Sequence, residues 1–315
     1  MKRYFCLLIL VFSIQFLFAQ DHIISGFASS PLSFNPATTG TFGNQNLRVY
    51  TGYGWDHFPV LFDDNSINLS VDKSLLKEHL GIGVNLLHGF GNDFENTDYA
   101  MLSAAYHSGF LDNQFTYSFG LQGGLLKHSV DWDQMIYRDP ISPIYDSVYI
   151  YPTDHIMVGD FNLGTLIFRN GDMIKIRPWI GFSVSHIFEP NLSLLNLSYP
   201  LPRKLIIHAG SHIRLNRFFV FTPRVMYSRQ KDYRTLDLEG TMKYQSGKFL
   251  VSLGNSYEHS KHDFFDINQV RLLASIGYAG LECRMEFLLL EFNQLVDINQ
   301  STGFIGLCWN LHKSK

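Results

Sequence analysis

The chain has 315 residues, of which 46% are hydrophobic, 15% are aromatic and only 17% are charged, and its formal net charge is −3. Ordinary soluble domains carry about 25% charged residues, while the high hydrophobic content excludes a disordered protein. The mean hydropathy is close to zero, and no run of about 18 apolar residues occurs beyond the N-terminus, which excludes a polytopic helical membrane protein. An exported β-rich chain remains, and a transmembrane β-barrel accounts best for this composition.

The first residues predict export. Lys2 and Arg3 form a positive n-region, residues 4–18 form an apolar h-region, and Ala19 is a small residue suited to cleavage. This pattern is typical of a secretory signal peptide over residues 1–19. A single membrane anchor is disfavoured, because the apolar part is short and no stop-transfer flank follows. No run of basic residues remains in the mature chain, so we expect no nucleic-acid partner.

Residues 20–45 form a leader before the first predicted strand. Within it, two prolines and an Asn-Pro step between Gly26 and Gly40 predict extended or turn geometry rather than helix. A periplasmic leader and a plug-like stretch in the barrel mouth both fit this segment. We predict a periplasmic N-terminal leader over residues 20–45.

Fourteen candidate strands follow, each a run of about 8 to 14 residues in which apolar and polar side chains alternate. The alternation is clearest in Thr235–Gln245, in Leu281–Leu289 and in residues 204–215. In a membrane barrel the apolar face contacts lipid, whereas in a soluble sandwich it faces the core. The strands are predicted to begin near Asn46, Asn65, Leu80, Asp98, Gln114, His155, Met173, Lys204, Phe218, Arg234, Lys248, Gln269, Leu281 and Ser301.

The connections between these strands alternate in length. Those after even-numbered strands are short, and those after odd-numbered strands are mostly longer, with residues 230–233 as an exception. Such alternation is typical of a meander with tight periplasmic turns at one end and longer extracellular loops at the other. We therefore predict an all-β fold, a transmembrane antiparallel up-and-down barrel of about 14 strands over residues 46–311, with a tail at 312–315. The predicted long loops are Trp55–Asp64, Ser129–Asp154, Glu189–Arg203 and His259–Asn268.

Aromatic residues cluster near the predicted strand ends, where girdles at the membrane interface are expected, although packing alone would explain most of them. Cys283 and Cys308 are predicted to point to opposite faces of neighbouring strands and to form no disulfide. The clustered aromatic residues are Tyr50, Tyr53, Trp55, Phe58, Phe218, Phe219, Phe221, Phe264, Phe265 and Trp309.

The histidines do not predict a metal site. His208 and His212 lie on one predicted strand, so roughly 13 Å separates them at ~3.3 Å per residue, too far to share an ion. Glu258, His259 and His262 are interpreted as a solvated surface cluster at a loop. No nucleophile elbow, phosphate-binding loop or zinc-protease helix is present. We therefore expect no enzyme, no catalytic residue, no metal and no cofactor.

The predicted interior face carries charges of both signs, which leaves two alternatives. They line an aqueous channel, or they pair across the lumen and make a closed, structural interior. Glu282, Arg284 and Glu286, beside Lys204 and Arg214, suit pairing. The sequence alone does not decide between them.

The leader carries a family resemblance. Ser30-Pro-Leu-Ser-Phe-Asn-Pro-Ala37, followed by Gly40, resembles the N-terminal signature of the PorP/SprF family of Bacteroidota outer-membrane proteins. The resemblance covers roughly residues 25–140, and Tyr137–Pro140 departs from the stretch that is usual in the family. Further matches follow in order at Arg48 with Trp55, Ser70–Lys73, Leu80–Val84, Leu102–His107, Ser118–Gly124 and Ser129–Trp132.

The resemblance implies an outer-membrane accessory of the type IX secretion system and gliding machinery. Such a protein lies in outer-membrane lipid and supports secretion or surface anchoring of a partner adhesin with a C-terminal sorting domain, alongside other secretion components. A passive outer-membrane channel or small-solute transporter is the alternative. Exposed apolar residues often mark contact surfaces, although folding back over the barrel would hide them equally well. The residues expected to bind partners are Pro31, Leu32, Phe34, Asn35, Pro36, Ala37, Ile144, Tyr145, Tyr149 and Tyr151.

Overall fold

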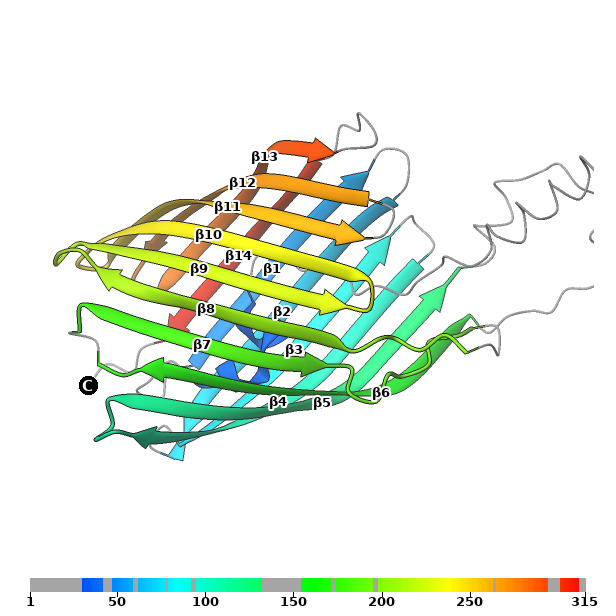
Figure 1. The fold of residues 1–315 in the computed structure, drawn as a ribbon, viewed down its shortest axis with the longest axis horizontal. Coiled ribbons are helices and arrows are strands. Elements are labelled where there is room, and N and C mark those ends of the chain that lie inside the picture. Colours follow the sequence, from blue (N-terminus) through cyan, green and yellow to red (C-terminus); the bar gives the residue numbers. More distant parts are fainter. Residues whose placement is uncertain are drawn as a thin grey trace, which may run out of the picture.

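The chain forms a closed barrel of fourteen antiparallel strands in which each strand is hydrogen-bonded to its neighbours in sequence and β1 closes on β14 (Figure 1). This computed structural model describes residues 30–41, 47–58, 62–76, 79–91, 95–131, 154–171, 174–194, 198–262, 265–293 and 301–311. Two short helices, α2 (Pro31–Phe34) and η1 (Pro36–Thr38), precede the barrel. The strands are β1 (Leu47–Phe58), β2 (Phe62–Leu75), β3 (Leu80–Gly91), β4 (Glu95–Phe110), β5 (Phe115–Val130), β6 (His155–Arg169), β7 (Ile176–Ser185), β8 (Lys204–Arg214), β9 (Phe219–Gln230), β10 (Tyr233–Ser246), β11 (Phe249–His262), β12 (Phe265–Tyr278), β13 (Leu281–Asn293) and β14 (Ser301–Leu311).

The predicted fold class is confirmed. All fourteen predicted strands occur, and five begin at the predicted residue, namely Leu80, His155, Lys204, Leu281 and Ser301. No helix in the described part of the chain is both long and apolar enough to cross a bilayer. The signal peptide predicted over residues 1–19 and the tail at 312–315 lie outside the described residues.

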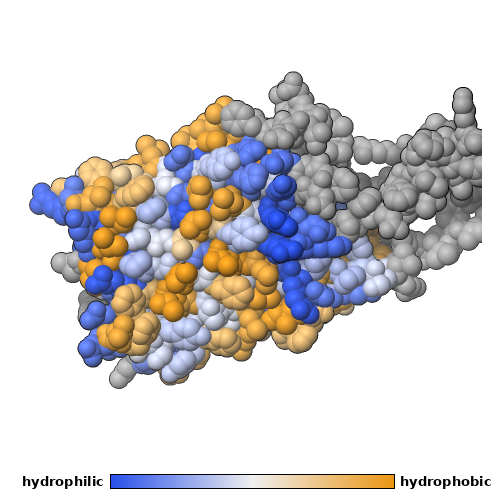
Figure 2. Space-filling model, viewed as in Figure 1, coloured by the Kyte–Doolittle hydropathy of each residue, from blue (hydrophilic) through white to orange (hydrophobic). Residues whose placement is uncertain are grey.

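The barrel is inverted in polarity relative to a soluble domain. On β10, Asp237 is 8% exposed while its neighbour Leu238 is 44% exposed, and on β13 Glu286 is 4% exposed while Phe287 is 40% exposed. Polar side chains therefore face the lumen and apolar side chains face outward, as lipid requires. Figure 2 shows apolar residues gathered along the middle of the barrel wall, with hydrophilic residues toward both ends.

The predicted lengths of two loops are wrong. β1 extends to Phe58 and β2 begins at Phe62, so most of the predicted loop Trp55–Asp64 is strand. Likewise β11 and β12 leave only residues 263–264 between them, within the predicted loop His259–Asn268. Polar residues continue these strands above the apolar wall, and polarity alone made them look like loops. The long connections are those after β5 and β7, at residues 131–154 and 186–203.

The cysteine prediction is confirmed, and the aromatic prediction needs one correction. Cys283 and Cys308 are both free, and only Cys308 is buried. Tyr53 and Trp309 face outward as girdle residues would, but Tyr50 is buried with the Arg48 guanidinium 5.3 Å from its ring centre. Tyr50 therefore belongs to the lumen. The side chains of Phe58, Phe264 and Phe265 lie outside the described residues.

Candidate functional site

Residues Ser30–Thr41, called the plug from here on, lie inside the barrel (Figure 1). Pro31 and Pro36 occupy the first turns of α2 and η1, where proline costs no hydrogen bond. Between them the Asn35 side chain accepts a hydrogen bond from the Ala37 N–H at 2.9 Å and caps η1. The sequence predicted no helix in this segment, and that prediction is wrong for α2 and η1, each of which is about one helical turn long.

The plug is held by hydrogen bonds to the strands that surround it. The Asn35 amide donates to the Thr165 carbonyl on β6 at 3.0 Å and lies 2.9 Å from His208 Nε2 on β8. Because backbone carbonyls of the plug accept most of the other bonds, the lumen wall satisfies polar groups that would otherwise be buried unpaired. The remaining contacts are Ser33 with Asn85, Phe34 O with Ser183, Ala37 O with Ser118, Thr39 Oγ1 with Ser103, and Thr39 O with His107.

Glycines in the wall make room for the plug. At Gly120 on β5 a Cβ would collide with the backbone of Pro36 and Ala37, and at Gly164 on β6 it would collide with the Asn35 side chain. Gly81 on β3 likewise meets the Thr39 carbonyl. A strand glycine commonly marks close approach of another backbone, and these recesses bring the wall into direct contact with the plug.

A buried ion pair closes the C-terminal end of the plug. Arg48 on β1 binds Asp72 on β2 through Nε–Oδ1 at 2.6 Å and Nη2–Oδ2 at 2.8 Å, and both side chains are 2% exposed. Asp72 Oδ2 also accepts the Gly40 N–H at 2.6 Å, while Arg48 Nη2 donates to the Thr38 carbonyl at 3.3 Å. The pair therefore joins two strands to the plug with charge-assisted bonds.

The segments that carry the family resemblance meet at this place. Although they are scattered between residues 30 and 132, seven of the members that face the lumen touch the plug or its ion pair. Their shared feature is the plug environment, which no single segment reveals. These members are Arg48, Asp72, Gly81, Ser103, His107, Ser118 and Gly120.

In the connection between β7 and β8, His186 and the described segments 191–194 and 199–201, together called the inward loop, fold against the lumen wall. His186 Nδ1 lies 2.9 Å from Asp160 Oδ2 on β6, and the side chains are 4% and 1% exposed. Leu192 and Leu201 pack on Leu126 of β5, which shares the lumen face of its strand with Gln122. The inward loop thus forms a small apolar core inside the barrel, on the same side as the plug.

The inward loop is itself ordered by hydrogen bonds. Asn191 and Pro200 form an antiparallel bridge, and Asn191 Oδ1 accepts the Tyr199 N–H at 2.7 Å. Burial, with a further contribution from Glu95, raises the pKa of Tyr199 to about 12. The Tyr199 phenol therefore stays neutral and packs against the leucine cluster.

The wall opposite the plug carries a network of buried and half-buried charges on β9 to β13. Arg271 binds Glu258 at 2.6 Å and Glu286 at 3.2 Å. Arg224 binds Glu239 at 2.8 Å, and Arg284 binds Glu282 at 3.0 Å. Removing one partner of such a pair leaves an uncompensated charge, so these side chains hold one another in place. The charge network comprises Arg224, Glu239, Lys243, Glu258, Arg271, Glu282, Arg284 and Glu286.

The charge network corrects two interpretations of the sequence. Glu258 is not a solvated loop residue, because it lies on β11 with its side chain 12% exposed and bound to Arg271. Glu282 pairs with Arg284, as the sequence suggested, whereas Glu286 pairs with Arg271, which was not among the residues proposed from sequence. Glu282 and Arg284 lie two residues apart on β13, and Arg271 meets Glu258 and Glu286 from the neighbouring strands β11 and β13.

The histidines and the predicted partner residues are also placed by the structure. His212 lies near Thr222 Oγ1 at 3.1 Å, while His208 belongs to the plug contacts. In the described part of the chain, no group of three His, Cys, Asp or Glu side chains is arranged to hold a metal ion. Pro31, Leu32, Phe34, Asn35, Pro36 and Ala37 are buried in the lumen instead of exposed. Ile144, Tyr145, Tyr149 and Tyr151 lie outside the described residues.

Some contributors to the site carry no motif. Gly164, Ser183, Asp160, His186 and Arg271 were not singled out from sequence. The glycines give the one usable signal, because a glycine on the polar face of a predicted strand suggests close approach of a backbone. The charged residues give none, since which residue of a neighbouring strand or loop they meet is set by strand register and loop folding.

Comparison with known proteins gives one family and one fold. The family model described as "Type IX secretion system membrane protein PorP/SprF" matches residues 16–297. No curated protein matches the chain. The structure is similar to the CymD monoaromatic hydrocarbon channel, with 11% identity, coverage of 94% of this chain and 95% of that one, and a TM-score of 0.55.

Two further solved structures share the barrel. The toluene transporter TbuX of Ralstonia pickettii is 8% identical over 91% of this chain and 94% of its own, with a TM-score of 0.56. The TodX deltaS2S3 mutant, a monoaromatic hydrocarbon channel, is 10% identical over 92% of this chain and 95% of its own, with a TM-score of 0.57. At such identities these likenesses show the fold alone.

Proposed function

Because the chain belongs to the PorP/SprF family of type IX secretion system membrane proteins, we propose that it is a non-enzymatic accessory barrel that supports secretion or surface anchoring of a partner adhesin. The family and the barrel fold support a place in the outer membrane. We further propose that the partner is an exported protein with a C-terminal sorting domain. Export would require removal of residues 1–19 as a signal peptide.

The content of the lumen is the observation that carries this proposal. The plug contacts successive strands from β1 to β8, the inward loop packs above it on β4 to β6, and paired charges line β9 to β13. An open pore needs a continuous aqueous path, whereas an accessory needs a rigid wall that presents its loops. The occupied lumen favours the accessory.

The partner contacts are proposed for the long connection after β5. Residues 131–154 join β5 to β6 and include Ile144 and three tyrosines, Tyr145, Tyr149 and Tyr151, and tyrosine is enriched at interfaces. The buried plug residues Pro31–Ala37 would reach a partner only if the plug left the lumen. A replacement of the three tyrosines by serine, Y145S/Y149S/Y151S, should therefore weaken partner capture more than any plug variant that retains the folded barrel.

Co-purification tests the proposal. The protein is tagged in the exposed short turn at Gly247 and recovered from mildly solubilised outer membranes, and its partners are identified by mass spectrometry. We expect other secretion components and one exported surface protein, and that protein should leave the cell surface when the gene is deleted. An unrelated outer-membrane barrel with the same tag is the control. Recovery of the barrel alone, with unchanged surface proteins after deletion, would contradict the proposal.

A passive channel or small-solute transporter is the second candidate, because the structural neighbours are hydrocarbon channels and a toluene transporter. The described lumen opposes a hydrocarbon path, because Arg48, Asp72, Asp160 and Arg271 line it and an apolar solute gains nothing from such walls. Planar bilayers distinguish the two candidates. A reproducible open-pore current from the wild-type protein would favour the channel.

A further inference from the structure

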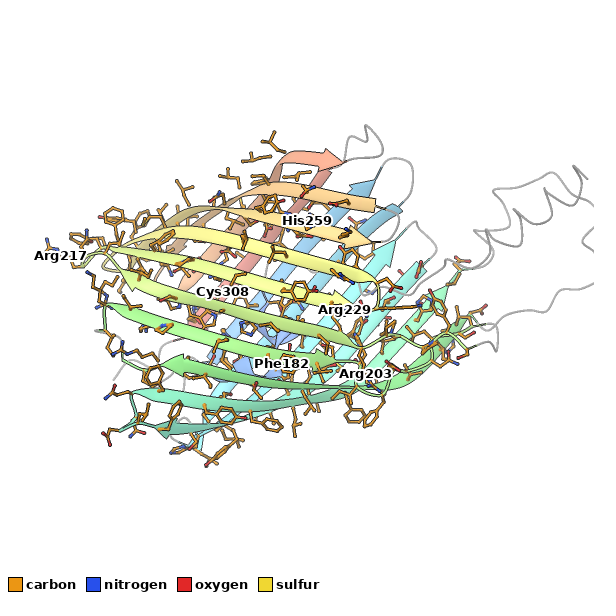
Figure 3. All side chains as sticks on the ribbon, viewed as in Figure 1. Phe182, Arg203, Arg217, Arg229, His259 and Cys308 are labelled. Carbon is orange, nitrogen blue, oxygen red and sulfur yellow. The ribbon has the colours of Figure 1, made fainter. Side chains whose placement is uncertain are left out.

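We propose that a row of basic side chains on the outer surface of the barrel binds the phosphate groups of lipid A in the outer leaflet. The basic row consists of Arg229 on β9, Arg234 on β10 and Lys261 on β11, and all three side chains are exposed. Figure 2 shows a strongly hydrophilic patch over the ends of these strands, directly beside the apolar wall. In Figure 3, Arg229 lies at this end of the barrel and Arg217 lies at the opposite end.

Strand register brings the three side chains together. Arg234 is directly opposite Arg229 in the β9–β10 pair and directly opposite Lys261 in the β10–β11 pair. Directly opposed residues of antiparallel strands have Cα atoms about 5 Å apart. Each member shares its face of the strand with outward apolar residues, namely Tyr227, Leu238 and Tyr257. The basic row therefore points away from the lumen, along the rim of the apolar wall.

The cations of the basic row outnumber the carboxylates beside them. Like charges directly opposite each other destabilise a sheet, and in the described part of the chain no ion pair involves Arg229, Arg234 or Lys261. Asp232 lies in the adjoining turn, and Asp266, opposite Lys261 in register, lies 3.2 Å from His259 Nδ1. Arg203 adds a further exposed cation beside them and lies 3.6 Å from Glu189. A bound anion would relieve the repulsion along the row.

The position of the basic row along the barrel axis indicates which ligand it binds. The row lies at the end of the barrel that carries the long connections, which is the extracellular end of an outer-membrane barrel. Headgroups of the outer leaflet lie at this level, and lipid A presents phosphate groups there. Guanidinium groups bind phosphate with paired hydrogen bonds, and clustered basic residues beside a bilayer contribute roughly 1 kcal/mol each toward anionic headgroups.

Binding of lipid A to the delipidated protein tests this inference. Wild type, the row variant R229Q/R234Q/K261Q and a control variant K175Q/R217Q/K248Q, which removes three exposed charges at the short-turn end, are placed in phosphatidylcholine nanodiscs. Bound bisphosphorylated lipid A is measured by native mass spectrometry. The row variant should bind at least about tenfold less, and the control variant should match wild type. Heat-modifiable mobility in gels checks folding, and R234Q alone, at the centre of the row, replaces the triple variant if it fails to fold.

Three further ligands identify the chemical group that the basic row recognises. Dephosphorylated lipid A should not bind above background, and phosphatidylglycerol and inorganic phosphate should bind more weakly than bisphosphorylated lipid A. The inference is overturned if the row variant retains wild-type binding, if dephosphorylated lipid A binds as well as the phosphorylated form, or if phosphatidylglycerol or inorganic phosphate binds equally well. This test is independent of the secretion role, because it needs no partner protein.

Discussion

Asn35 in the plug and His208 on β8 form a buried hydrogen bond of 2.9 Å across 173 residues of sequence. The orientation of the Asn35 amide is set by its oxygen, which accepts the Ala37 N–H. Its nitrogen must therefore donate to His208 Nε2, which requires a neutral imidazole with its proton on Nδ1. The Asn35 side chain thus caps η1 within the plug and also binds the plug to β8.

This arrangement predicts that Asn35→Asp loosens the plug. A carboxylate cannot donate to the Thr165 carbonyl or to His208, and it brings an unpaired charge into the lumen. We expect a loss of about 3 kcal/mol in the free energy of unfolding, measured by denaturant titration in detergent. Asn216→Asp is the matched control, because its side-chain oxygen only accepts, from the Phe218 and Phe219 N–H groups in an exposed turn. Equal stability of the two variants would contradict the assigned contacts.

The recess at Gly120 predicts that a larger residue expels the plug. A Cβ at Gly120 would collide with the plug backbone, so Gly120→Val should expose Ser33. With Cys283 and Cys308 replaced by serine, a Ser33→Cys probe should react with a thiol reagent much faster in the Gly120→Val background. Gly240→Ala, whose added Cβ meets only ordinary contacts, should leave labelling slow. Unchanged labelling in both backgrounds would show that the recess does not seat the plug.

The Arg48–Asp72 pair predicts a large effect for removal of one charge. Asp72→Asn leaves the Arg48 guanidinium buried without a carboxylate, which costs about 3–5 kcal/mol when a buried pair is broken. The midpoint of heat modifiability in detergent should fall accordingly. Asp98→Asn removes a carboxylate that is 41% exposed and binds His88 at 2.6 Å, so its effect should stay within about 1 kcal/mol.

The charge network predicts rescue by matched neutralisation. Arg271→Met leaves Glu258 and Glu286 buried without their cation, and we expect a destabilisation of about 3–5 kcal/mol. The combination R271M/E258Q/E286Q removes the stranded charges and should recover much of that loss. Stability is compared by denaturant titration. A triple variant that is less stable than Arg271→Met would mean that the two glutamates are held by other groups.

The two occupants of the lumen predict a joint effect on conductance. Leu192→Ser with Leu201→Ser should release the inward loop from Leu126, and Gly120→Val should displace the plug. Because each occupant still obstructs the lumen when the other is displaced, only the combined variant should give a clear increase in single-channel current in planar bilayers. Wild-type currents equal to those of the combined variant would show that neither occupant closes the barrel.

Several features could be predicted from sequence because they are local. Period-two alternation over Thr235–Gln245 and Leu281–Leu289 identifies strands with one lipid face, since lipid tolerates apolar side chains only. The predicted loop boundaries at Trp55 and His259 are wrong, because polar strand ends outside the apolar wall resemble loops when only neighbouring residues are considered. The six motif segments pointed to the family, but not to their common meeting place.

The sequence by itself therefore determined the number of strands, their faces and the family, because each of these is written in neighbouring residues. Only the tertiary structure decided that Pro31–Ala37 is buried inside the barrel, that Glu258 belongs to Arg271, and that Arg229, Arg234 and Lys261 form one row. Burial of the plug depends on closure of the barrel, and the other two relationships depend on strand register. A shift of one residue in register reverses the face of every side chain in a strand, so no local pattern can specify which distant residues meet.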